Sequence, residues 1–136
     1  MAQYIGGDIL EITCNHPNLG SFRFATKADE SYTIDPGGYR SDDDDSMITG
    51  DGQMIDKINR VRWHIEGPVQ CDFISENEVK NLPLLSESPV LGTWTVTHIS
   101  GVVWRGLGKP VGDLQADSND ANISLKIAGG GRLEKL

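Results

Sequence analysis

The sequence lacks the features that mark membrane, secreted or disulfide-rich proteins. No apolar run approaches the roughly 18 residues that a membrane-spanning helix needs. Residues 1–4 supply neither the basic nor the apolar part of a secretory signal. The two cysteines, Cys14 and Cys71, are too few for a disulfide framework or a zinc site. We therefore expect a soluble protein that is made and kept in a reducing cytoplasm.

The chain also lacks a surplus of positive charge. Its formal net charge is −8, and residues 28–56 hold the whole imbalance, with nine acids against the single base Arg40. A protein that binds nucleic acid tightly needs a basic face that releases counterions from the phosphates. The charge distribution therefore disfavours tight DNA binding, but it is compatible with passive contact with DNA.

Motifs for metal or phosphate binding are incomplete. The run from Asp42 to Asp45 invites a calcium interpretation, but the ordered glycine–glutamate frame of an EF-hand loop is absent. The segment around Gly108-Lys109 lacks the earlier glycine and the following Ser or Thr of a phosphate loop. We expect a solvated acidic loop, no metal site and no cofactor.

Nucleophilic chemistry has little support either. Cys14 and His16 share a strand face, and His64 and His98 lie on other predicted strands. A buried thiol usually behaves as a small apolar side chain, and that interpretation suits Cys14 better than a nucleophile or a metal ligand. The sequence therefore predicts no catalytic residue, and we expect that the protein is not an enzyme.

Period-two alternation of apolar residues dominates the chain and predicts strands. The length of 136 residues fits a single domain spanning residues 1–136. Strands are expected at residues 8–15, 21–25, 32–34, 54–66, 69–73, 93–98, 102–107 and 122–128. Residues 41–52 are expected to form a long loop, and Gly67-Pro68 a turn. The result is a mainly β fold: an antiparallel β-sandwich or barrel.

One short helix interrupts the strands. Ser75 and Glu78 fit the spacing of a capping box, in which Ser75 would begin the helix. Pro83 limits the expected length to one or two turns. The inward-facing positions of the strands predict the core, which comprises Val61, Trp63, Ile65, Trp94, Val96, Ile123, Leu125 and Ile127.

The order of these segments resembles the tail tube proteins of tailed bacteriophages, especially those of contractile tails. An N-terminal hairpin leads to Ile34-Asp35-Pro36-Gly37-Gly38-Tyr39-Arg40, and an acidic loop closes through Ile48-Thr49-Gly50-Asp51-Gly52. A strand pair and one short helix come next. A strand of the Gly92-Thr93-Trp94-Thr95-Val96 type follows, and Asn122-Ile123-Ser124-Leu125-Lys126-Ile127 precedes a glycine-containing tail. The resemblance spans residues 7–133, although the four successive aspartates have no match in it.

The resemblance implies a structural virion protein that assembles into hexameric rings, which stack into a tube that conducts DNA. Type VI secretion systems and phage-derived bacteriocins use related tubes. If six subunits give about four strands each, strand spacing and tilt set a bore of roughly 40 Å, wider than duplex DNA. The implied partners are copies of this chain and also sheath, baseplate and tape-measure proteins, with no membrane. The implied location is the phage tail, after synthesis in the host cytoplasm.

The resemblance also places the contacts between subunits or rings on the long loop. The residues concerned are Arg40, Asp42, Asp43, Asp44, Asp45, Met47, Ile48 and Asp51. We expect this loop to be mobile in an isolated subunit and to become ordered against a neighbouring ring. Two alternatives remain open at this point. One is a tail adaptor or terminator, and the other is a β-sandwich module that binds a ligand or carbohydrate through Trp63, Trp94 and Trp104.

Overall fold

The computed structural model describes residues 2–136, within which it contains eleven strands and a single helix. The prediction of a mainly antiparallel β fold with one short helix is confirmed. The elements are β1 (Ile9–His16), β2 (Gly20–Phe24), β3 (Thr33–Asp35), β4 (Gly38–Ser41), β5 (Ile58–Val61), β6 (Trp63–Gln70), α1 (Asn77–Glu87), β7 (Gly92–His98), β8 (Val103–Pro110), β9 (Ala116–Asp117), β10 (Asn122–Gly129) and β11 (Glu134–Lys135).

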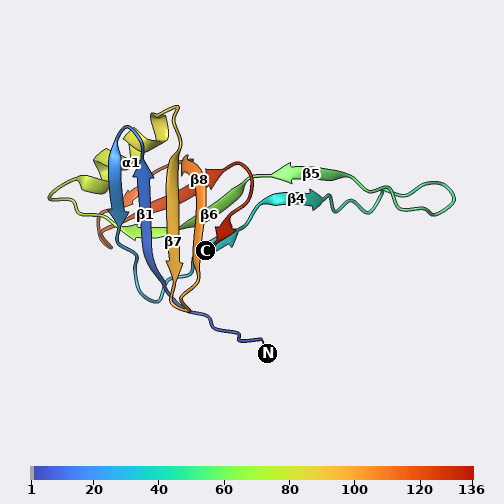
Figure 1. The fold of residues 1–136 in the computed structure, drawn as a ribbon, viewed down its shortest axis with the longest axis horizontal. Helices are drawn as coiled ribbons and strands as arrows, with labels where there is room; N and C mark the ends of the chain where they lie inside the picture. The colour runs from blue at the N-terminus through green and yellow to red at the C-terminus, as the bar shows by residue number, and fades with distance from the viewer. Residues whose placement is uncertain (1) are drawn as a thin grey trace.

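The main sheet follows the order β2-β1-β7-β8-β10-β6-β3 and does not close into a barrel. Every strand pair is antiparallel; β11 adds to β8, and β9 adds to β10. β8 and β10 pair only through Ile127 with Pro110 and Ala128 with Lys109. This short junction lets the sheet fold into two halves whose strands cross steeply, with α1 at one side (Figure 1). The open edges of the sheet are β2 and β3.

The core lies between the two halves of the sheet and extends to α1. Seven of the eight expected core side chains are at most 2% exposed: Trp63, Ile65, Trp94, Val96, Ile123, Leu125 and Ile127. Leu82 and Leu85 of α1 join the same cluster. The expectation for Val61 is wrong, because this residue is only half-buried. Val61 ends β5, which pairs with β4 outside the main sheet, so only part of its side chain reaches the body.

The predicted turn at Gly67-Pro68 is also wrong, because β6 runs through both residues. β3 pairs with β6 only as far as Glu66, so no neighbouring strand on that side needs an N–H from Pro68. Tyr32 fills the space instead, and its hydroxyl donates to the Pro68 carbonyl. A Cβ on Gly67 would lie 2.2 Å from the Tyr32 ring, so the glycine provides room for the aromatic side chain.

The helix begins later and runs further than the capping-box pattern predicts. α1 starts at Asn77 after Glu76, which adopts a left-handed φ of 55° and provides no side-chain cap. The Glu78 carboxylate accepts from the Asp72 amide at 2.9 Å rather than from Ser75. Pro83 lies within the helix and does not end it. The 11 residues make about three turns, because a turn takes about 3.6 residues.

Trp63 packs against three glycines from neighbouring strands. A Cβ on Gly106, Gly108 or Gly129 would come within 2.8 Å of its indole ring, and one on Gly129 would also lie 1.9 Å from the Leu107 carbonyl oxygen. Backbone cannot yield to such a contact without moving the strands. The glycines therefore allow the ring to lie against the sheet itself.

We predict that Gly129→Ala lowers the free energy of unfolding by about 1–3 kcal/mol, the usual cost of overpacking a core. Gly130→Ala is the matched control, because a Cβ there meets nothing within 4 Å. Chemical denaturation of both variants measures the difference. Equal stability of the two variants would show that the Trp63 environment is loosely packed.

Candidate assembly surface

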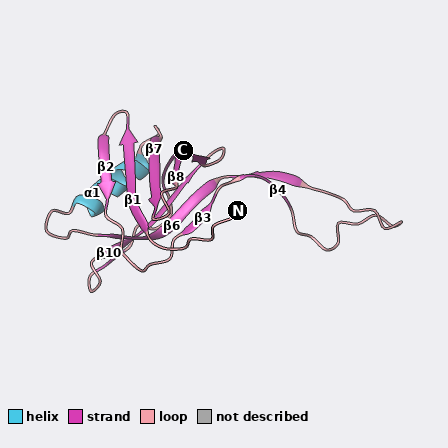
Figure 2. Cartoon of the chain, turned by 60° about the horizontal axis from the view of Figure 1, so that its bottom comes forward, coloured by secondary structure: helices cyan, strands magenta, loops and turns pink. Residues whose placement is uncertain are grey.

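Residues 38–61 form an arm that projects from the body of the protein (Figures 1 and 2). β4 pairs with β5 from Gly38–Val61 to Ser41–Ile58, and this two-stranded ribbon is separate from the main sheet. The sequence predicted a loop beginning at Ser41 and did not predict β4. A ribbon of two short strands is marginally stable on its own. An arm of this kind is therefore suited to gain stability from contact with another molecule.

A polar network holds the root of the arm. The Arg40 side chain donates to the Asp35 carboxylate, which also accepts from the Gly37 amide at 3.0 Å. His64 lies 3.8 Å from the second oxygen of Asp35. The bond from Arg40, followed by that from Gly37, lowers the pKa of Asp35, so this carboxyl stays ionised. Arg40, expected to contact a neighbouring subunit, thus has a partner in its own chain.

The tip of the arm, residues 42–56, carries six aspartates and no basic residue. The Asp42 carboxylate accepts from Asn59 at 3.0 Å and lies 3.8 Å from the Lys57 amine. Bonds from the Ser46 hydroxyl and amide lower the pKa of Asp44. Asp43 and Asp45 are exposed, and within the described part of the chain neither forms an ion pair. The tip is therefore strongly negative at neutral pH.

Backbone bonds fold the tip back on itself. The Ile55 amide donates to the Met47 carbonyl at 2.9 Å, and the Thr49 amide donates to the Gln53 carbonyl at 2.7 Å. Ile48 bridges to Met54, and the Thr49 hydroxyl donates to Asp51. All the loop residues expected to mediate assembly, from Asp42 to Asp51, therefore lie together on the arm beyond β4.

Large apolar side chains are exposed along this arm. Met54 is 74% exposed, Tyr39 65%, Ile58 60%, Ile48 55% and Ile55 46%. Single exposed apolar residues are ordinary on protein surfaces, but a group of them on one projecting ribbon indicates a contact surface. The apolar groups lie beside the aspartates, so the arm offers both burial and charge to a partner.

Three arginines line a hollow at the root of the arm. Arg60, Arg62 and Arg132 surround a space of about 620 Å³ together with Gly38, Tyr39, Val61, Gly130 and Gly131. The Arg60 guanidinium carbon lies 5.5 Å from the centre of the Tyr39 ring, and its Nε donates to the Tyr39 hydroxyl at 3.2 Å. The sequence alone did not reveal this arginine hollow, because Arg132 comes from the C-terminal tail, far from Arg60 in the chain.

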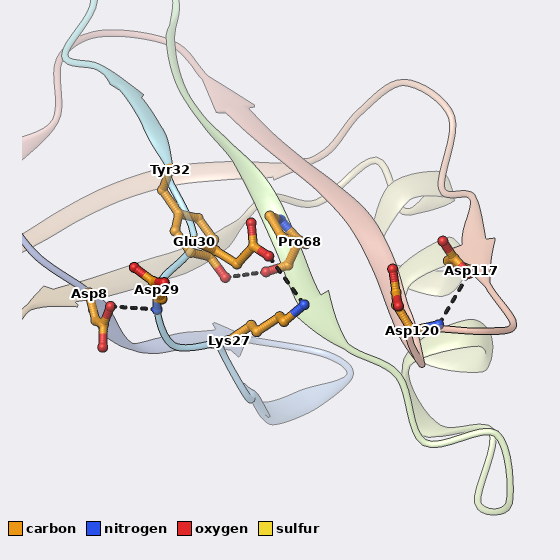
Figure 3. Close-up of polar contacts among 8 residues, drawn as sticks. All are labelled: Asp8, Lys27, Asp29, Glu30, Tyr32, Pro68, Asp117 and Asp120. Atoms are coloured by element: carbon orange, nitrogen blue, oxygen red, sulfur yellow. Dashed lines mark hydrogen bonds and ion pairs between the residues drawn. The ribbon is translucent and has the colours of Figure 1, made fainter.

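A second hollow, of about 580 Å³, lies beside the connection between β2 and β3. Figure 3 shows how this connection is held: Lys27 pairs with Glu30 at 3.2 Å, and the Asp8 carboxylate accepts from the Asp29 amide at 2.9 Å. Trp104 lines the hollow and is half-buried. These contacts join residues of the loop to one another and to the segment around Asp8. They hold the loop in place, which is the usual role of such contacts at a protein surface.

The tryptophans do not form the exposed cluster that a carbohydrate-binding module would use. Trp63 is fully buried and Trp94 is 1% exposed, so neither can lie against a sugar. Trp94 stacks on Phe24 with 5.7 Å between ring centres, and its Nε1 donates to the Gly108 carbonyl at 3.1 Å. Two of the three aromatic residues considered for ligand binding are therefore parts of the core.

The surroundings of Cys14 and His16 are those of residues with a structural role. Burial raises the pKa of the Cys14 thiol to about 11, so the reactive thiolate is scarce at neutral pH. His16 is 2% exposed; its Nε2 lies 2.9 Å from the Val90 carbonyl, and its Nδ1 accepts from the Asn18 and Leu19 amides at 3.1 Å.

Across residues 2–136 no three His, Cys, Asp or Glu side chains gather as metal ligands would. No helix in this range is long and apolar enough to cross a membrane.

Comparison with known proteins gives a likeness among solved structures. No protein-family model matches the chain, and no curated protein matches it. The chain is similar to one in a structure described as "Cryo-EM structure of the anti-feeding prophage (AFP) baseplate, 6-fold symmetrised". The two are 14% identical, the alignment covers 100% of this chain and 97% of the other, and the TM-score is 0.46. At this TM-score the likeness establishes neither a common fold nor a common function.

Proposed function

We propose that this protein is a structural subunit of a phage-type tail, in which hexameric rings stack into a tube. The observation that carries the proposal is the projecting arm, which holds exposed apolar side chains and a strongly acidic tip away from the body. Apolar side chains left exposed on a projecting ribbon have a cost in solubility unless a partner covers them. In the proposed tube the partner is the neighbouring ring.

The open sheet edges suit contacts within a ring. β2 and β3 are the end strands of the main sheet, so each has a neighbouring strand in this sheet on one side only. Such edges pair readily with strands of other chains. Pairing between six copies would join part of the sheet into the continuous barrel that lines a tube. Ring formation would then pair the free backbone groups of these edge strands, while the arm connects one ring to the next.

The solution mass as a function of protein concentration tests the proposal. We expect sedimentation to show a monomer at low concentration and association into rings or longer assemblies as the concentration rises. A monomer at every concentration, in the presence and absence of crowding agents, would contradict self-assembly. A stable dimer with no larger species would also contradict it.

Passage of DNA without binding is the expected property of an assembled tube. Each subunit carries a net charge of −8, and six copies surround the bore. The acids and bases outside residues 28–56 balance, so the strands of the body hold no surplus of bases to bind phosphates, and the acids that do face the bore repel DNA within the roughly 8 Å that screening allows at physiological salt. We predict that assembled protein binds a labelled duplex more weakly than the roughly 10⁻⁴ to 10⁻⁶ M typical of non-specific binders.

A fluorescence titration of assembled protein at two salt concentrations measures that affinity. Repulsion predicts little binding at either concentration. Micromolar binding that weakens as salt rises would show an organised basic surface in the bore, and would favour a DNA-binding protein over a conduit.

A further inference from the structure

The arginine hollow is a concentrated positive site without a negative partner. No carboxylate lines it. Among the described residues, no ion pair joins Arg60, Arg62 or Arg132 to an acid. Asp35 and Glu134, each within three residues of the lining in the sequence, are otherwise engaged, since Asp35 pairs with Arg40 and Glu134 lies 3.6 Å from Arg105. The chain has a net charge of −8, so three arginines around one hollow are a local exception to its overall negative charge.

The hollow is built by backbone that leaves space for it. Gly130 and Gly131 form one wall, and Gly38 forms another. The Arg132 side chain crosses Gly38, where a Cβ would come within 2.6 Å of its Nε. Tyr39 holds Arg60 in place by its ring and its hydroxyl. Guanidinium groups arranged in this way suit carboxylates, which they bind through paired N–H donors.

The same chain carries the complementary group at the other end of the arm. The tip places Asp43 and Asp45 in solvent without a basic partner, and Asp44 stays ionised beside Ser46. The length of the arm separates this tip from the hollow in its own subunit, as Figures 1 and 2 show. The tip of a subunit can therefore reach an arginine hollow only in another copy.

We propose that the acidic tip of one subunit binds in the arginine hollow of a second copy. The inference rests on the proposed function, because it names the surface that receives the arm between neighbouring subunits. The contact uses two different surfaces, tip and hollow, so each subunit gives one and receives one. Head-to-tail contacts of this kind build rings or open stacks rather than closed pairs. Tyr39, which lines the hollow and is 65% exposed, adds apolar area to the contact.

Reversal of charge on each side tests the contact. Asp43→Lys with Asp45→Lys reverses the tip, and Arg62→Glu with Arg132→Glu reverses the hollow. Each pair should weaken self-association, measured by sedimentation, by about tenfold or more, because like charges then face each other. The four substitutions together should restore it, since a basic tip then meets an acidic hollow.

Two controls separate this contact from net charge. Lys80→Glu with Lys135→Glu changes the net charge as much as the hollow reversal, but neither residue lines the hollow or lies on the edge strands β2 and β3. This pair should associate like the wild type. Combined with the reversed tip, it recovers the net charge of the wild type and should still fail to associate. Rescue by this combination would overturn the inference.

A disulfide trap decides the inference even where larger assemblies are scarce. Chains with Asp44→Cys are mixed with chains carrying Arg132→Cys under mild oxidation; the native Cys14 and Cys71 are buried. A cross-link formed in the mixture well above that in either chain alone supports the contact. Tubes that form despite both charge reversals would overturn the inference and leave the proposed function standing. A monomeric wild type would contradict the proposed function, and with no cross-link in the mixture it would overturn both.

Discussion

Removal of residues 42–52 is expected to leave a folded subunit that cannot form tubes. The deletion takes away Asp42–Asp45, Met47, Ile48 and Asp51, while the core lies in the body between the two halves of the sheet. The backbone bonds of these residues run to one another and to residues 53–57, so the body loses no contact of its own. The melting temperature should change by no more than about 3 °C, the shift that roughly 1 kcal/mol gives in a domain of this size.

Circular dichroism measures whether the deletion variant is folded, and sedimentation measures whether it assembles. A matched control replaces residues 42–52 by a Gly/Ser segment of equal length, which keeps the span of the arm but removes its charge and apolar groups. It should also fail to form tubes. Normal tubes from either variant would show that the tip has no part in assembly. Loss of the folded state would show that the arm belongs to the folding unit.

Replacement of Trp94 by alanine is expected to cost about 3–5 kcal/mol of unfolding free energy, the typical loss for a large aromatic core residue. Trp94 is 1% exposed, stacks on Phe24 and donates from Nε1 to the Gly108 carbonyl. The variant loses the packing and also leaves that buried carbonyl without its side-chain donor. Because a small domain is only about 5–15 kcal/mol stable, little soluble protein should remain.

Yield and melting temperature check this expectation, with Leu107→Ala as the control. Leu107 lies on β8 next to β7 and is 57% exposed, so its truncation should change stability by about 0.5 kcal/mol or less. A Trp94→Ala protein that melts with the wild type would contradict the burial of the indole. A large loss in the control would instead point to a contact on the outer face of the sheet.

The inward positions of the strands were predictable because their apolar residues alternate strictly. Trp94 and Val96, and likewise Ile123, Leu125 and Ile127, show a period of two in the sequence, and the structure buries them all. Val61 shows the limit of that signal. It alternates with Trp63 and Ile65, but its strand belongs to the arm, and alternation does not reveal which strands join the main sheet.

Other errors arose where a residue outside the motif decides the local structure. Gly67-Pro68 has the composition of a turn, but Tyr32 and the early end of β3 allow β6 to continue through it. Ser75 has the spacing of a cap, but the Asp72 carboxylate instead accepts the Ile74 and Ser75 amides at 3.0 and 3.2 Å. In both places a hydrogen-bond partner outside the motif changes the outcome.

The two parts of the candidate site also differ in how far the sequence reveals them. The acidic tip is contiguous in the sequence, so its charge and its glycines were visible directly. The arginine hollow combines β5, the β5–β6 junction and the C-terminal tail. Arg132 reaches it because the Leu133 amide donates to the Pro36 carbonyl at 3.0 Å, which fixes the tail beside the arm. A contact between residues so far apart in the chain leaves no recognisable pattern in a single sequence.

Electron microscopy of the purified wild-type protein, negatively stained at high concentration, tests the central claim most directly. The account predicts rings with six-fold symmetry and tubes of uniform width, with a bore of roughly 40 Å set by the spacing and tilt of the strands. The deletion of residues 42–52 should abolish the tubes in the same preparation. Isolated particles of monomer size at every concentration, or filaments without a central bore, would contradict the account.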